Sequence, residues 1–144
     1  MIKEIKDNNI LYAKIIRASY QSKDTEFFTD DSDEIQLGYI TFKKNHKTGA
    51  HYHNHLNKET NRTDEILIVQ NGSARVDFYN TKGEYIISSE IFKNDILIIH
   101  QGGHNLVFYE DTKVLAIKSG VYEKERSKTR MIGTNNLELI IEND

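Results

Sequence analysis

Short apolar segments recur about every 8–12 residues along most of the chain, with turn-forming residues between them. In several segments apolar and polar side chains alternate, as in a strand with one buried face. Strands are predicted at residues 35–42, 65–69, 74–79, 85–87, 96–99, 106–109 and 114–117. This spacing predicts an all-β fold, an antiparallel β-barrel or jelly roll.

The turns between these segments carry their own signals. Asn71-Gly72 is a strong tight-turn dipeptide, and further turns are expected at 80–83, 93–95 and 110–112. Residues 10–16 fit either a strand or a short helix. Residues 137–141 are predicted to be a last strand that covers a sheet edge or reaches a partner subunit. Apolar ends and exposed sheet edges favour a homodimer.

Composition excludes several classes of protein. The chain has 144 residues, which fits one domain, and 19 Lys and Arg against 22 Asp and Glu. The resulting net charge of −3 disfavours a nucleic-acid partner. No apolar run approaches the roughly 18–20 residues of a membrane span, and the first residues carry no signal-peptide pattern. Cys is absent, so thiolate sites are excluded. We expect a cytoplasmic protein without a membrane partner.

All six histidines lie between residues 46 and 104. His51 and His53 are two positions apart, so on a strand both imidazoles project from one face. Neutral imidazole is a common ligand for divalent transition metals. A carboxylate and a third histidine would complete a shell of nitrogen and oxygen ligands. The cofactor expected here is a divalent transition metal such as Zn, Fe, Ni or Mn.

This arrangement resembles the two motifs of the cupin superfamily, small barrels of the jelly-roll type. The first motif, HxH followed by Glu and then Gly, is matched by His51, His53, Glu65 and Gly72. The second motif is matched by residues 94–104, ending in His104, with Asn94 at the position of a Gly and His100 at that of a Pro. The resemblance covers residues 35–120 of a single cupin-like domain, 1–144. It implies His51, His53, Glu65 and His104 as the metal ligands.

A second register is open, because eleven residues separate His53 from Glu65. His53, His55 and Glu59 fit the family's shorter spacer, but Glu59 falls in a polar stretch, whereas Glu65 heads a strand at the right distance from Gly72. We favour Glu65 and assign His55 and Glu59 to the barrel mouth, as residues that contact substrate.

The polar stretch 54–64 is long enough to suggest a functional loop. Its Arg62 could bind an anionic substrate such as a phosphate, sugar nucleotide or carboxylate. His100 fits either a pocket residue that contacts substrate or a strand-end residue.

Two functions follow from these expectations. The first is a metal-dependent enzyme acting on a small polar molecule, an isomerase, epimerase or oxygenase, with Glu65 as metal ligand or as catalytic general base. The second is a non-catalytic module that binds or senses such a molecule. The chain also resembles, more weakly, small cupins associated with surface-polysaccharide biosynthesis, which implies a sugar-related substrate.

Overall fold

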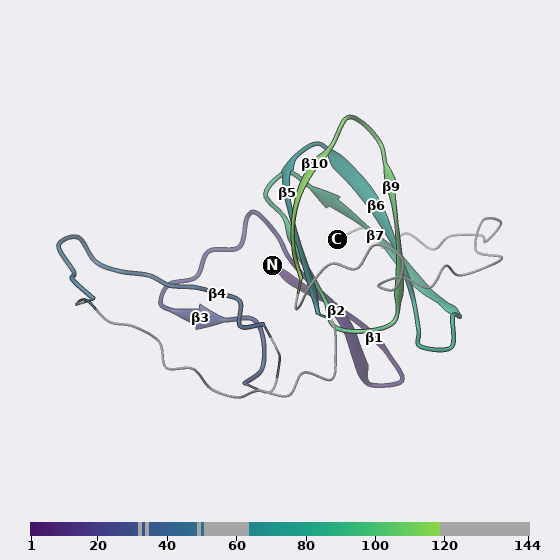
Figure 1. The fold of residues 1–144 in the computed structure, drawn as a ribbon, viewed down its shortest axis with the longest axis horizontal. Helices are drawn as coiled ribbons and strands as arrows, with labels where there is room; N and C mark the ends of the chain where they lie inside the picture. The colour runs from purple at the N-terminus through teal and green to yellow at the C-terminus, as the bar shows by residue number, and fades with distance from the viewer. Residues whose placement is uncertain (32, 34, 49, 51–63, 119–144) are drawn as a thin grey trace.

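The computed structural model describes residues 1–31, 33, 35–48, 50 and 64–118 (Figure 1). Within these residues the fold is all-β, and every strand pair is antiparallel. The strands are β1 (Ile2–Asp7), β2 (Ile10–Ile16), β3 (Glu26–Phe27), β4 (Gly38–Tyr39), β5 (Glu65–Asn71), β6 (Ser73–Tyr79), β7 (Tyr85–Phe92), β8 (Ile96–Ile99), β9 (Gly103–Phe108) and β10 (Lys113–Lys118). The prediction of an all-β antiparallel fold is therefore confirmed.

The strands form three sheets. The large sheet has the order β1-β2-β8-β5-β10, and the small sheet has the order β7-β6-β9. The pair β3-β4 belongs to a third layer, the cover, defined by residues 20–31, 33 and 35–39. Figure 1 shows the cover beside the large sheet, on the side away from the small sheet.

Successive apolar side chains along β5 and β8 point alternately to the two faces of the large sheet, and both faces are buried. On its inner face, Leu67, Val69 and Leu97 join residues of the small sheet in one core. On its outer face, Ile66 and Ile98 pack with Phe28 of the cover. A strand buried on both faces needs a continuous apolar run, which is what the isoleucine-rich β5 and β8 supply.

Two turns show why particular residue types are needed. Asn8 and Asn9 join β1 to β2 with φ values of 48° and 63°, a left-handed pair typical of tight hairpins, which Asn tolerates well. Asn94, between β7 and β8, has a φ of 68°. Asn94 therefore adopts the left-handed conformation that a glycine at this position would also supply.

Asp95 fixes the turn between β7 and β8 in place. Its carboxylate accepts hydrogen bonds from the backbone N–H groups of Phe92 (3.0 Å) and Ala18 (2.9 Å). It also pairs with the Arg17 guanidinium at 2.9 Å, and both side chains are largely buried. The turn that returns the chain to the large sheet is thus tied to the segment that follows β2.

The structure refines the strand predictions in two places. Residues 10–16 form a strand, whereas the predicted strand over 35–42 is reduced to Gly38–Tyr39. Ile35 and Leu37 are apolar because they pack on the outer face of the large sheet. The turn at Gly72 forms as expected, with a φ of 86°, but it leads from the large sheet to the small sheet. The predicted strand at 137–141 lies outside the described residues.

Candidate functional site

Glu65 and His104 meet at one end of the inner core. Glu65 opens β5 in the large sheet, and His104 is the second residue of β9 in the small sheet. Glu65 shares its face with the core residue Leu67, and His104 lies opposite the core residue Phe78. The Glu65 Oε2 and His104 Nε2 atoms are 3.3 Å apart. The fold thus brings together two of the four predicted metal ligands.

Lys118 completes the surroundings of this carboxylate. It lies directly opposite Glu65 in the β10–β5 ladder, and its Nζ is 2.9 Å from Glu65 Oε1. Burial raises the pKa of Glu65, but hydrogen bonds from His104 and Lys118 and their charges outweigh it and lower that pKa to about 2. Glu65 is therefore ionised at neutral pH. Such a carboxylate suits a metal ligand or a charge anchor better than a general base, whose pKa would lie near the working pH.

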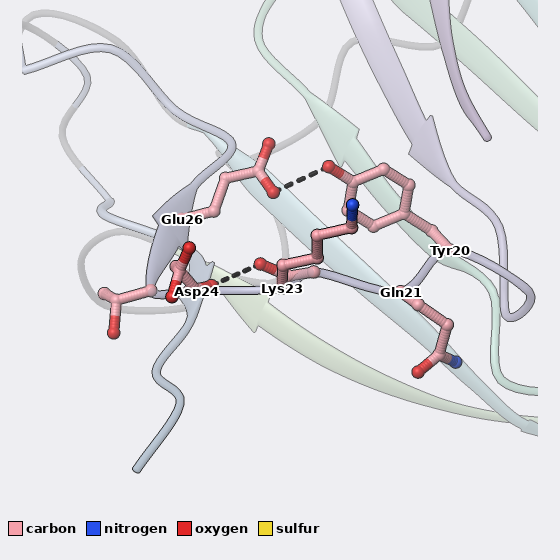
Figure 2. Close-up of a pocket in the computed structure, with 7 residues that line it drawn as sticks. Tyr20, Gln21, Lys23, Asp24 and Glu26 are labelled. Atoms are coloured by element: carbon pink, nitrogen blue, oxygen red, sulfur yellow. Dashed lines mark hydrogen bonds between the residues drawn. The ribbon is translucent and has the colours of Figure 1, made fainter. Parts of the chain in front are cut away.

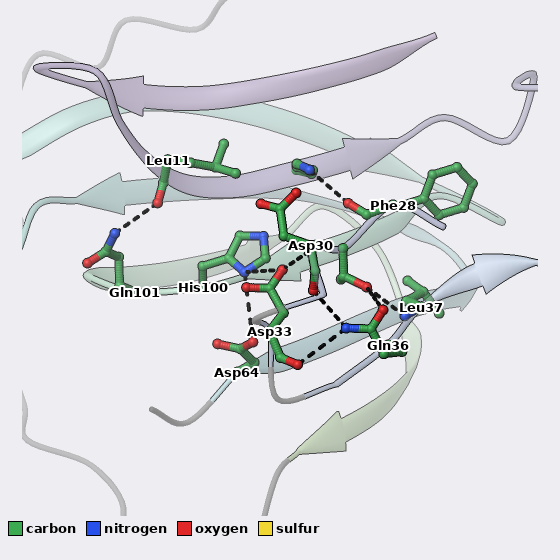
Figure 3. Close-up of polar contacts among 11 residues, drawn as sticks. Leu11, Phe28, Asp30, Asp33, Gln36, Leu37, Asp64, His100 and Gln101 are labelled. Carbon is green, nitrogen blue, oxygen red and sulfur yellow. Dashed lines mark hydrogen bonds and ion pairs between the residues drawn. The ribbon is translucent and has the colours of Figure 1, made fainter. Parts of the chain in front are cut away.

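A second polar group lies on the opposite face of the same two strands. Asp64 precedes β5 and His100 follows β8, and since Glu65 pairs with Ile99, Asp64 and His100 stand opposite each other. Neighbouring residues on a strand point to opposite faces, so this pair projects from the outer face. Asp33, in the cover, meets it there (Figure 3).

Asp33, Asp64 and His100 form what we call the outer group, and all three are buried. His100 Nδ1 is 3.8 Å from an Oδ2 atom of Asp33 and 3.8 Å from one of Asp64. Candidate ligand atoms of the three residues lie within 4.8 Å of one another, and the group could hold a metal ion. The exposed fractions of the three residues are only 6%, 1% and 4% for Asp33, Asp64 and His100.

The predicted site residues thus fall into three sets. Glu65 and His104 lie together on the inner face. His100 lies with the two aspartates on the outer face, opposite the face that carries Glu65. The remaining predicted residues lie outside the described part of the chain: His51, His53, His55, Glu59 and Arg62.

Sequence reasoning missed Lys118, Asp33 and Asp64. Lys118 could have been found only from the register between the strands at 65–69 and 114–117. Asp64 directly precedes the strand that carries Glu65, so strand alternation already places it on the other face. Asp33 stands in an acidic stretch that resembles an ordinary solvated turn, and its sequence carries no signal for burial.

Two other polar features carry no comparable chemistry. The chain between β2 and β3 lines a surface hollow at residues 20–26, where the Tyr20 hydroxyl donates a hydrogen bond to Glu26 at 2.6 Å (Figure 2). On the small sheet, Asp77 is buried and accepts hydrogen bonds from Arg75, Ser88 and Asn105. These contacts, which lower the pKa of Asp77 against the raising effect of burial, make it a structural carboxylate.

Comparison of the chain with protein-family models, curated proteins and solved structures finds no match. Among the described residues, no helix has the length and apolar character needed to cross a bilayer.

Proposed function

We propose that the chain is a cupin-like, metal-dependent protein that acts on a small polar molecule such as a sugar, sugar nucleotide or organic acid. The observation that carries this proposal is the meeting of Glu65 and His104, from two different sheets, with 3.3 Å between their side-chain atoms. A carboxylate and an imidazole at the end of an apolar core form half of a mixed nitrogen and oxygen shell. His51 and His53 would supply the other half.

The residues present fit such a metal. The low pKa of Glu65 keeps its carboxylate ionised, which is the form that binds a cation. Glu65 and His104 would hold the ion, which as a Lewis acid would polarise a carbonyl or hydroxyl oxygen of the substrate. Lys118 would hold the second carboxylate oxygen and so orient the ligand, a role that partners of metal ligands commonly have.

A non-catalytic binding module is the second candidate. The observation that favours it is the pairing of Glu65 with both Lys118 and His104, which balances the carboxylate with protein groups alone. In this version the small polar ligand forms hydrogen bonds with Glu65, His104 and Lys118 directly, without a metal.

Metal analysis tests the first candidate. We expect purified or reconstituted protein to lose one equivalent of bound metal in His104→Ala and in Glu65→Gln. His46→Ala is the matched control, because this histidine is exposed and its ring stacks on Phe42, away from both groups. Wild-type metal content in both inner variants after reconstitution would refute the inner metal site.

A ligand screen separates the two candidates. Sugars, sugar nucleotides and organic acids are tested for a rise in the thermal unfolding midpoint, with added metal and with a chelator. The metal-dependent version predicts that the chelator abolishes the rise and any turnover. The binding-module version predicts a rise that the chelator leaves unchanged and that Lys118→Met removes.

A further inference from the structure

We propose that Asp33, Asp64 and His100 bind a divalent first-row transition metal ion, with Zn²⁺ as the first choice, and that this ion ties the cover to the large sheet. The inference is independent of the proposed function, because the outer group shares no residue with the Glu65–His104 site and lies on the opposite face of β5 and β8.

The donor geometry is close to that of a zinc site. Zinc bound at about 2.1 Å to nitrogen and oxygen ligands in a tetrahedron sets those ligands roughly 3.4 Å apart. His100 Nδ1 is 3.8 Å from a carboxylate oxygen of each aspartate. These two distances would need to shorten by a few tenths of an ångström, a change that side-chain rotation can provide, and candidate ligand atoms of all three residues lie within 4.8 Å of one another.

The state of the His100 imidazole is a separate indication of a ligand. The residue is 4% exposed, and neither ring nitrogen forms a hydrogen bond with the rest of the described chain. An imidazole buried in this way loses its hydration without replacement, which is unfavourable. Figure 3 shows the ring directed at the two aspartates. A metal ion on Nδ1 would give that nitrogen the partner that it lacks among the described residues.

The donor types point to the same class of ligand. Two carboxylates and one imidazole, all three buried, offer a mixed set of oxygen and nitrogen donors. Ca²⁺ and Mg²⁺ prefer shells made of oxygen alone, whereas an imidazole with two carboxylates suits Zn²⁺ and its first-row neighbours.

The ion would join segments that are distant in sequence. Asp64 and His100 belong to adjacent strand ends of the large sheet, and Asp33 belongs to the cover. Within the described part of the cover, a backbone hydrogen bond from Asp33 to Asp30 and one from the Asp30 N–H to the Asp33 carboxylate hold Asp33 in a turn. Three protein ligands from two layers form a cross-link that holds the cover over the outer core.

The test uses the full chain in the His104→Ala background, so that the inner site is removed first. Metal-free protein is titrated with Co²⁺ and then Zn²⁺, and bound equivalents are counted. We expect the His104→Ala protein to bind one equivalent of metal, and the double variant that also carries His100→Ala to bind none. We expect Asp33→Asn to weaken binding by more than about tenfold. Asn keeps an acceptor for the Asp30 N–H, so this second variant preserves the turn.

A local readout checks the cross-link itself. Zn²⁺ should slow trypsin cleavage after Lys23, an exposed residue of the cover, in His104→Ala and leave it unchanged in the double variant. Metal-independent cleavage at Lys23, or the same Zn²⁺ affinity with and without His100 and Asp33, would overturn the proposal. Loss of all metal in His104→Ala, with one equivalent retained in His100→Ala, would overturn it and leave the inner site standing.

Discussion

Glu65→Gln is the substitution that most directly tests the electrostatics of the inner site. The pKa of Glu65 is about 2, against an ordinary value of 4.5. That difference corresponds to about 3 kcal/mol of preference for the ionised form in the folded protein. Solvent still reaches 15% of the Glu65 side chain and 27% of that of His104, and it screens part of this interaction. We therefore expect Glu65→Gln to lower the free energy of unfolding by about 2 kcal/mol at neutral pH.

The pH dependence of this effect has a defined sign. The folded pKa lies below the unfolded one, so the stabilisation is fully present above about pH 4.5 and is lost as the pH falls toward about 2. Urea unfolding of wild type and variant, with a chelator present, measures the difference at several pH values from about 7 down to about 3.5. The difference between the free energies of unfolding of wild type and Glu65→Gln should become smaller over the lower part of this pH range.

Asp111→Asn is the matched control, since Asp111 is an exposed carboxylate in the turn before β10. We expect its effect to stay within about 0.5 kcal/mol. If Glu65→Gln were as stable as wild type, or if the difference in their free energies of unfolding did not change with pH, the ionised Glu65 held by His104 and Lys118 would be refuted.

Three further substitutions test the packing around the sites. Asp77→Ala should lower the free energy of unfolding by about 1–3 kcal/mol in guanidinium, because it removes a buried acceptor of hydrogen bonds from Arg75, Ser88 and Asn105; a loss below 1 kcal/mol would contradict this. Gly102→Ala should lower stability by about 1–3 kcal/mol in thermal unfolding, since Gly102 has a φ of 78° and its added Cβ would meet the carbonyl oxygen of Tyr79; an unchanged midpoint would argue against this backbone. Leu97→Ala, in the middle of the inner core, should lower it by about 2–5 kcal/mol, seen by calorimetry; a smaller loss would mean that the core collapses around the gap.

Much of the strand pattern could be predicted from the sequence because its signals are local. Residues 96–99 were expected as a strand and form β8, and the alternation at 74–79 corresponds to β6. Turn residues also act locally, as the hairpin at Gly83, with a φ of 84°, shows. Alternation and turn chemistry do not say which strands pair. The sequence therefore did not show that the turns at Gly72 and Asn94 lead from one sheet to the other.

The sites depend on pairings of this non-local kind. His104 and Glu65 were expected together through the cupin resemblance, and the structure places them together. The partner Lys118 follows only from the register of β10 on β5. Predicting the outer group would require the register of β5 on β8 and also the position of the cover. The buried Asp33 of the cover looks like a solvent-exposed residue in the sequence. Its burial depends on how the cover packs, which short-range patterns do not encode.

The two polar groups share adjacent residues of β5, and this limits how the chain can vary. Asp64 faces outward and Glu65 inward only because β5 keeps its pairing with β8. Deleting Ile66 would shift the pairing of the preceding residues with β8 by one position. Every side chain before the deletion would then turn to the opposite face of the sheet. Asp64 would then point at His104 and Glu65 at the cover. Insertions and deletions within β5 should therefore be excluded in functional variants, because a single one would disturb both polar groups at once, whereas a substitution at Asp64 or Glu65 disturbs only the group to which that residue belongs.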